Sequence, residues 1–303
     1  MKTLKFGVAG TAYWAANVQM VGLQRVKGAK LTAVWGRDPA KSAALAEKWG
    51  ARAYADFNAM LAEVDVVSFA LPPMAQEQMA LRAIAAGKHV LLEKPMATNL
   101  AAAKRLAAEI RKNDVTALVF FTRRFFPELV AAVAEAKKRK WRNVTVEILS
   151  AAFSNESPYK DSFWRRDSGA ELWDLGPHIL SLLIEALGPV TAQRALPSEE
   201  GYSRFETIHE SGAMATSLIT LSARPEDRCN RYIFDDGETR MVFPDLPPDY
   251  PSAYVRAIEN LISLIAQGKR AHPLDAEFGV ETTAILEAID TMRKSSSRSG
   301  ESR

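Results

Sequence analysis

The chain of 303 residues has one cysteine, Cys229, and only four histidines. A lone cysteine excludes an internal disulfide and a thiolate metal cluster. No apolar run approaches the roughly 18 residues that a membrane helix requires. The N-terminus enters a glycine turn at Gly7–Gly10, which leaves no room for a signal peptide. We therefore expect a cytoplasmic protein without a membrane partner.

An excess of charge of one sign is also lacking, since 39 basic and 36 acidic residues give a net charge of +3. Residues 293–303 hold four basic residues and one acidic residue, so this segment accounts for the whole excess. The basic cluster at 137–142 lies at the end of a predicted helix, where cations complement the helix dipole. We expect no nucleic-acid partner, and a flexible tail over 293–303.

The first 121 residues alternate between short apolar strands and alanine-rich helices. Strands are predicted at Leu4–Ala9, Leu31–Trp35, Val64–Leu71, His89–Leu92 and Ala117–Phe121, and helices at Thr11–Gln24, Pro39–Trp49, Gln76–Ala86 and Asn99–Lys112. Strands that are apolar on both faces are typical of a buried parallel sheet. Their alternation with helices over short connections predicts an α/β domain with a doubly wound parallel sheet over residues 1–121.

After Phe121 the pattern changes to fewer helices and a series of strands. Helices are predicted at Pro127–Lys140, Glu171–Leu187, Tyr254–Ala266 and Phe278–Met292, with a strand at Val144–Ala152 and strand-like stretches over 191–243. The dipeptide Asp236-Gly237 favours a tight hairpin. This pattern predicts an α+β domain over 122–292 with an open, mainly antiparallel sheet.

The turn after the first strand has the form of a dinucleotide-binding motif. Gly10, Ala12 and Ala15 fit G-x-G-x-x-A with alanine in the middle position. Backbone N–H groups at the start of the following helix would face a pyrophosphate. The candidate cofactor residues here are Gly10, Thr11, Ala12, Tyr13 and Trp14. An ordinary strand–helix turn is the alternative.

The end of the second strand bears on the choice of nicotinamide cofactor. An acidic residue at the strand tip would bind the ribose 2′-hydroxyl, but this chain has Gly36 and Arg37 there. Asp38 precedes Pro39, where a helix N-terminus accounts for it. Arg37, helped by Lys41, could bind a 2′-phosphate. This favours NADP over NAD, which stays open, and a surface arginine is the alternative.

Three further residues could carry acid–base chemistry. Lys94 follows the strand His89–Leu92, at an edge where ligands of open α/β sheets bind. Asp174 and His178 are four residues apart and share a helix face if the helix is continuous. A histidine can accept a hydroxyl proton, and a lysine can polarise the same oxygen. Solvated surface residues are the alternative, and the remaining histidines lack metal-ligand spacing.

Three stretches resemble the Gfo/Idh/MocA family of NAD(P)-dependent oxidoreductases. The segment Ala86–Ala97, AGKHVLLEKPMA, is similar to the family's AGKHV…EKP signature. Trp164–Ala170 running on to His178 is similar to its WR…GG…DxGxH segment, and Arg123–Pro127 to its RRF-x-P crossover. With the glycine turn, the resemblance extends in order over nearly the whole chain.

The resemblance implies a Rossmann domain followed by an α/β domain whose open sheet forms homo-oligomer contacts, in a dimer or tetramer. It implies that Lys94 touches cofactor and substrate, that Asp174 and His178 contact the substrate, and that His178 accepts the proton. Trp164 and Arg165 would line the nicotinamide end. Leu71, Pro72 and Glu93, at two strand ends, complete the candidate cofactor contacts. The Lys94–Pro95 bond would be cis.

These features together predict hydride transfer between NADP or NAD and a sugar-like polyhydroxy alcohol or ketone. Pro73, Gln76 and Ser181 depart from the family pattern of Asn, His and Asp at these places, in the surroundings of cofactor and substrate, so an atypical substrate is expected. Two alternatives remain. One is a non-catalytic NAD(P)-sensing regulator of the same fold, and the other is cofactor-assisted elimination such as glycoside cleavage.

Overall fold

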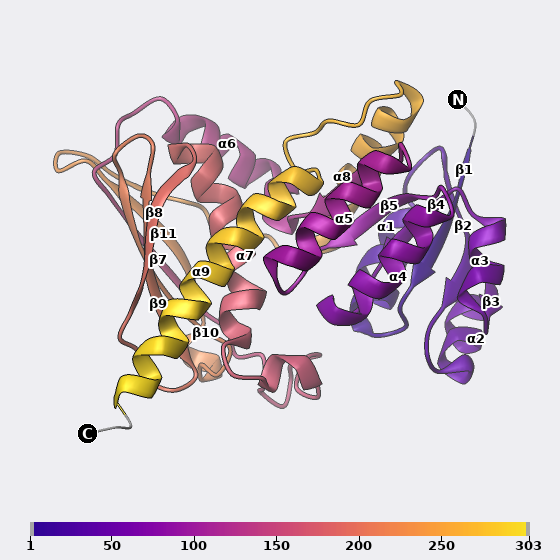
Figure 1. Ribbon diagram of the computed structural model, residues 1–303, viewed down its shortest axis with the longest axis horizontal. Coiled ribbons are helices and arrows are strands. Elements are labelled where there is room, and N and C mark those ends of the chain that lie inside the picture. The colour runs from indigo at the N-terminus through magenta and orange to yellow at the C-terminus, as the bar shows by residue number, and fades with distance from the viewer. Residues whose placement is uncertain (1–2, 301–303) are drawn as a thin grey trace. The chain divides into compact units, whose positions relative to one another are not determined.

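The computed structural model describes residues 3–300, with side chains as far as residue 295, and the chain forms two compact units (Figure 1). The first unit runs to Phe125 and takes up the chain again over Pro248–Thr283. The second holds Phe126–Pro247 and the chain from Ala284 onward. The units therefore do not follow one another as residues 1–121 and then 122–292, because residues 248–283 return to the first unit.

The first unit contains a six-stranded parallel sheet with the strand order β3-β2-β1-β4-β5-β6. The strands are β1 (Leu4–Ala9), β2 (Ala29–Trp35), β3 (Arg52–Tyr54), β4 (Val66–Phe69), β5 (His89–Glu93) and β6 (Ala117–Phe120). Every residue of the central strand β4 and of the edge strand β6 is buried, as expected of a parallel sheet whose faces are covered by helices. The prediction of a doubly wound parallel sheet is confirmed. The order reverses between β1 and β4, where such sheets bind ligands beyond the carboxyl ends of their strands.

The helices of this unit include a π-helix (Ala15–Gln19) leading into α1 (Met20–Leu23), α2 (Pro39–Lys48), α3 (Phe57–Glu63), α4 (Pro73–Ala85), α5 (Leu100–Lys112) and α8 (Tyr250–Ala266). Short polar side chains cap the N-termini of α2, α3, α5 and α8 among them. The Asn99 side chain accepts the Ala102 N–H at 2.8 Å and so caps α5. In Figure 1, α4 and α5 run side by side on the parallel sheet.

Two elements of the first unit were not predicted. β3 has only three residues, Arg52–Tyr54, and none of them is buried, so it lacks an apolar signal. α3 has seven residues, and its N-terminus is capped by Asp56, which accepts the Asn58 N–H at 3.0 Å. Both elements are too short for a periodic pattern to indicate them.

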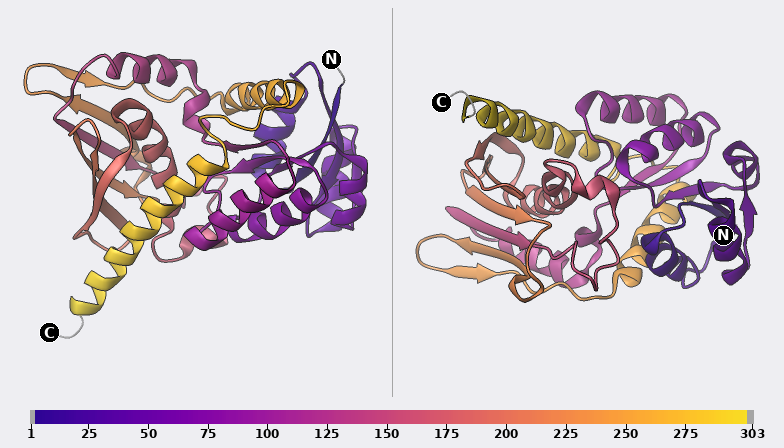
Figure 2. Two further views of the ribbon diagram at one scale, coloured as in Figure 1. Left: turned by 45° about the horizontal axis from the view of Figure 1, so that its top comes forward. Right: turned by 90° about the horizontal axis from the view of Figure 1, so that it is seen from below.

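The second unit contains a six-stranded sheet with the order β12-β11-β7-β10-β9-β8. Its strands are β7 (Asn143–Leu149), β8 (Val190–Leu196), β9 (Tyr202–His209), β10 (Met214–Thr220), β11 (Cys229–Asp235) and β12 (Arg240–Val242), and its helices include α6 (Pro127–Ala136) and α7 (Ala170–Leu187). Only β7 and β10 pair in parallel, so the predicted mainly antiparallel sheet is confirmed. Figure 2 shows the β11–β12 hairpin at one edge of this sheet.

The second sheet has one buried face and one exposed face. α7 packs on β9 and β10. Along β9, Ser203 and Phe205 are buried, whereas Arg204 and Ile208 are exposed. This alternation matches the open sheet that the sequence predicts.

The last helix continues beyond the predicted end. α9 spans Ala276–Gly300 rather than ending at Met292, and residues 301–303 of the predicted flexible tail lie outside the described residues. Asp290 stabilises the extension, since it pairs with Arg293 at 2.8 Å and Lys294 at 2.6 Å one turn later. None of the described helices combines the length and apolarity needed to span a membrane.

Candidate active site

Gly10 directly follows β1 in a conformation that only glycine tolerates. Its φ is +136°, and a Cβ there would lie 2.9 Å from the Ala70 carbonyl carbon, at the end of β4. A side chain would therefore separate the two strand ends. Ala12 and Tyr13 are exposed just beyond this turn, while Thr11 and Trp14 are partly buried.

The segment after β2 packs against the same turn. A Cβ on Gly36 would lie 2.7 Å from Thr11 Cγ2 and 3.1 Å from Ser42 Oγ, so the glycine permits a close approach. Arg37 and Lys41 are exposed beside it.

The Asp38 carboxylate serves as the N-cap of α2. It accepts the N–H groups of Ala40 at 3.0 Å and Lys41 at 3.1 Å, as the sequence interpretation requires. This carboxylate is therefore already used in capping.

Glu93, at the carboxyl end of β5, turns its side chain into the unit. Its Oε1 accepts the Trp14 indole N–H at 2.6 Å and the Gln19 amide at 3.0 Å. Burial raises the pKa of Glu93 to about 7, while the Lys94 charge and the two side-chain hydrogen bonds act in the opposite direction. Glu93 thus ties β5 to the glycine turn through Trp14.

This buried carboxyl group makes the stability of the protein depend on pH. Because its pKa rises from 4.5 to about 7 on folding, the folded protein holds a proton that the unfolded chain has lost over that range. The free energy of unfolding should therefore fall as the pH rises from 4.5 to about 7, and then level off. The expected fall is roughly 3 kcal/mol.

Replacing Glu93 by glutamine should remove this fall, since glutamine keeps an acceptor for Trp14 and carries no titratable group. Urea unfolding of both proteins at about pH 5 and about pH 8 measures the difference. Equal pH dependence in the two proteins would show that Glu93 does not hold the proton.

A buried polar network that the sequence did not indicate extends from Glu93. Gln19 also donates to the Phe69 carbonyl at 2.6 Å and accepts the Ser68 hydroxyl at 3.0 Å. Ser68 is hydrogen-bonded to the Tyr254 hydroxyl of α8. Satisfied buried networks of this kind make their surroundings rigid. The network holds the ends of β4 and β5, next to the glycine turn, in place.

Lys94 follows Glu93 in a turn that is otherwise buried. Lys94 is partly exposed, whereas Glu93 and Pro95 on either side are buried. The Lys94–Pro95 peptide bond is cis, as the resemblance implied. On the neighbouring strand end, after β4, Leu71 is partly exposed and Pro72 is exposed.

The first unit therefore gathers most of the predicted cofactor residues at one edge of its sheet. Gly10–Trp14, Gly36–Lys41, Leu71–Pro72 and Glu93–Lys94 follow the carboxyl ends of β1, β2, β4 and β5. In a parallel sheet these ends lie on the same side, and β1 and β4 flank the point where the strand order reverses.

In the second unit, Asp174 and His178 lie one turn apart on α7. The helix begins after Gly169, whose φ is +83°, and is continuous across both residues with Pro177 inside it. Because the helix is continuous between them, the two side chains lie on the same helix face. Asp174 is buried and His178 is partly buried.

Asp174 has a partner that the sequence did not indicate. Its carboxylate accepts two hydrogen bonds from Arg165, at 2.7 Å from Nε and 3.3 Å from Nη2. The guanidinium also lies over the Trp164 and Tyr159 rings, each 4.5 Å from the centroid. Arg165 therefore fixes the direction of the Asp174 carboxylate and compensates its charge.

The other three histidines take structural roles. His89 Nδ1 accepts the Thr116 N–H at 2.9 Å, His272 Nδ1 accepts the Leu274 N–H at 3.0 Å, and His209 is hydrogen-bonded to the Gly188 carbonyl. Burial lowers the pKa of all three. Within residues 3–295 no group of three His, Cys, Asp or Glu side chains is arranged to hold a metal ion.

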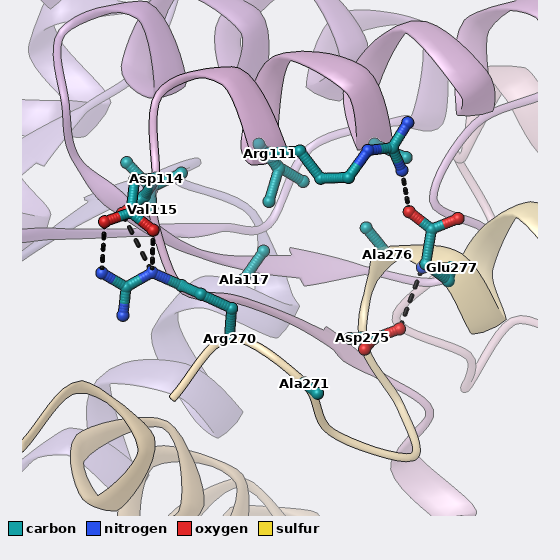
Figure 3. Close-up of a pocket in the computed structure, with 11 residues that line it drawn as sticks. Arg111, Asp114, Val115, Ala117, Arg270, Ala271, Asp275, Ala276 and Glu277 are labelled. Atoms are coloured by element: carbon teal, nitrogen blue, oxygen red, sulfur yellow. Dashed lines mark hydrogen bonds and ion pairs between the residues drawn. The ribbon is translucent and has the colours of Figure 1, made fainter. Parts of the chain in front are cut away.

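A cavity of about 290 Å³ lies elsewhere in the first unit, beside the beginning of β6 (Figure 3). Its apolar lining includes Ile110 and Val115. Arg270 at its rim is paired with Asp114 at 2.9 Å. A second ion pair joins Arg111 and Glu277. Because each arginine already has a carboxylate partner and the cavity is at the other end of the strands, it does not belong to the candidate cofactor site.

Comparison with known proteins agrees with the fold and the motifs. The family model described as "Oxidoreductase family, NAD-binding Rossmann fold", for Gfo/Idh/MocA proteins, matches residues 4–121. An uncharacterized oxidoreductase, ORF334 of Rhizobium meliloti, is 34% identical over 95% of this chain and 96% of its own length. Inositol 2-dehydrogenase 2 of Saccharopolyspora erythraea is 38% identical over 41% of this chain and 38% of its own. The crystal structure of GenD2 from gentamicin A biosynthesis, in complex with NAD, has a TM-score of 0.83 at 21% identity, covering 96% of this chain and 94% of that one.

Proposed function

Since the chain belongs to the Gfo/Idh/MocA family of oxidoreductases, we propose that it transfers a hydride between a nicotinamide cofactor and a sugar-like polyhydroxy alcohol or its ketone. One observation carries the proposal. The segments at the carboxyl ends of β1, β2, β4 and β5 lie together at the edge of the parallel sheet where the strand order reverses. The relative named as an inositol dehydrogenase supports a polyhydroxy substrate.

The residues at this edge fit a dinucleotide. There is no room for a side chain at Gly10 between the ends of β1 and β4, and the residues Ala12 and Tyr13 just after it are exposed. Gly10–Trp14 would hold the pyrophosphate, and Gly36 and Arg37 the adenosine ribose. When bound, the nicotinamide supplies the hydride chemistry.

The protein's own side chains would move the proton and stabilise charge. In the oxidising direction His178 accepts the substrate hydroxyl proton as the hydride leaves the same carbon. Lys94 stabilises the charge that develops on that oxygen. Asp174, held by Arg165, orients a substrate hydroxyl or the His178 ring.

We propose NADP as the preferred cofactor, and Arg37 as the residue that distinguishes it. Replacing Arg37 by alanine should weaken NADPH binding by roughly 10- to 100-fold, since a charge-assisted hydrogen bond to phosphate contributes about 1.5–3 kcal/mol. NADH binding should change little. Fluorescence titration with both cofactors measures the two dissociation constants, and Arg52→Ala, on the edge strand β3, serves as a surface control. Tighter binding of NADH than NADPH by tenfold or more in the unsubstituted protein would contradict the preference.

A panel of inositols, sugars and their ketones with each nicotinamide cofactor tests the function itself. The proposal predicts that product and oxidised or reduced cofactor form in equal amounts. Cofactor binding without turnover in either direction would favour the NAD(P)-sensing regulator. Turnover with no net change in nicotinamide absorbance would favour elimination.

The remaining expectations are parts of the same proposal. The exposed face of the second sheet, with Arg204 and Ile208, supports homo-oligomer contacts of the kind that the resemblance implies, in a dimer or tetramer. The single cysteine supports a cytoplasmic location. Neither nucleic acid nor a membrane is proposed as a partner.

A further inference from the structure

We propose that Gln76 is a positioning residue that fixes the turn carrying Lys94 and so determines where the Lys94 ammonium lies. The inference rests on the proposed function in one respect: Lys94 must act in the reaction for its position to matter. Gln76 itself is fully buried and has no contact with solvent.

The Gln76 amide binds the main chain on both sides of Lys94. Its Oε1 accepts the Glu93 N–H at 2.7 Å, and its Nε2 donates to the Glu93 carbonyl at 2.9 Å. The same Nε2 lies 3.3 Å from the carbonyl oxygens of both Pro95 and Met96. One side chain therefore spans the peptide groups from residue 93 to residue 96, with Lys94 between them.

The far side of the turn is held by packing rather than by hydrogen bonds. A Cβ on Gly279 of α9 would lie 2.8 Å from Met96 Sδ, so a side chain there would displace the Met96 side chain from its present position. Met96 is buried. The turn is thus held between the Gln76 amide and the surface of α9, and Lys94 is its partly exposed member.

The position of Gln76 follows from the start of α4. Pro73 opens this helix, and the Gln76 main-chain N–H donates to the Pro72 carbonyl at 2.9 Å. The first turn of α4 therefore aims the amide at the end of β5. An amide offers donor and acceptor together, which suits a target that presents one N–H and three carbonyls.

Removing the amide should mainly affect catalysis. In a Gln76→Met variant the buried Glu93 N–H and the carbonyls lose their partner while the volume is nearly kept. A displacement of about 1 Å at a catalytic group costs up to roughly 100-fold, so we expect kcat to fall by roughly 10- to 100-fold. The dissociation constant of NADPH should change by less than about threefold, since the phosphate turn is untouched.

The experiment compares Gln76→Met with Thr116→Val, a matched control that removes a buried side-chain hydrogen bond at the start of β6. The measurements are kcat, KM, NADPH affinity and hydrogen exchange by mass spectrometry. We expect faster exchange confined to amides of residues 93–97 in Gln76→Met, and an unchanged kcat and unchanged exchange there in Thr116→Val. If Gln76→Met does not fold, Gln76→Asn carries the test, since it keeps an amide but shortens its reach to the Glu93, Pro95 and Met96 carbonyls by one methylene, and it should also lower kcat.

Two results would overturn the inference. One is a folded Gln76 variant with kcat within twofold of the unsubstituted protein. The other is exchange that rises equally throughout the first unit, which would make Gln76 a general stabilising residue. Failure of the proposed function looks different. The unsubstituted protein would then show no turnover, while hydrogen exchange at residues 93–97 would still report whether Gln76 holds this turn.

Discussion

Replacing His178 by alanine should lower kcat by roughly 10²- to 10⁴-fold, the usual contribution of a general acid–base residue. The reason is that His178 is the residue proposed to accept the substrate proton, and alanine cannot accept it. NADPH affinity should stay within about twofold, because the segments proposed to hold the pyrophosphate and the adenosine ribose belong to the first unit. Steady-state kinetics and fluorescence titration measure the two effects separately.

The control for this variant is a histidine with a purely structural role. His272→Asn keeps an acceptor for the Leu274 N–H and should leave kcat unchanged. Loss of cofactor binding in His178→Ala, or a kcat that survives the change, would refute the assignment of His178 as the proton acceptor.

Replacing Lys94 by methionine should lower kcat by roughly 10²- to 10³-fold, the effect of removing one charge-stabilising donor. The methionine keeps most of the side-chain length while removing the charge. Lys88→Met is the matched control, because Lys88 precedes β5 and Lys94 follows it, so the two lie at opposite ends of the same strand. Lys88→Met should leave kcat unchanged.

The double variant His178→Ala with Lys94→Met tests whether the two residues act as a unit. Residues that serve one transition state are strongly non-additive, so the double variant should be little worse than the poorer single variant. Turnover that survives both substitutions would mean that the reaction does not use them.

The parallel sheet of the first unit could be predicted because its strands are short, apolar on both faces and separated by capped helices. The prediction of secondary structure failed for elements too short to give a clear hydrophobic pattern in the sequence. β3 is a short edge strand with no buried residue, and α3 is shorter than two full helical periods. The extension of α9 to Gly300 depends on the pairs that Asp290 makes with Arg293 and Lys294, against a serine-rich composition that favours fraying.

The residues of the candidate site could be proposed from the sequence, whereas the contacts that hold them in place could not. Lys94, Asp174 and His178 stand out by residue type and by their place at a strand end or on a helix face. The contacts that hold them join residues far apart in sequence: Gln76 to Glu93 over 17 positions and Ser68 to Tyr254 over 186. Such partners are chosen by tertiary packing, which a single sequence does not display. The Arg165–Asp174 pair, nine positions apart, is equally without a local pattern.

The most direct test of the central claim follows the hydride itself. The protein is given reduced cofactor in which deuterium replaces both hydrogens at C4 of nicotinamide, the carbon that transfers the hydride, together with a ketone from the substrate panel. We expect one deuterium atom per product molecule, on the carbon that becomes the alcohol, and the His178→Ala with Lys94→Met variant should form the same labelled product at least about 100-fold more slowly. Product that forms without deuterium at that carbon would contradict hydride transfer as the function of this protein.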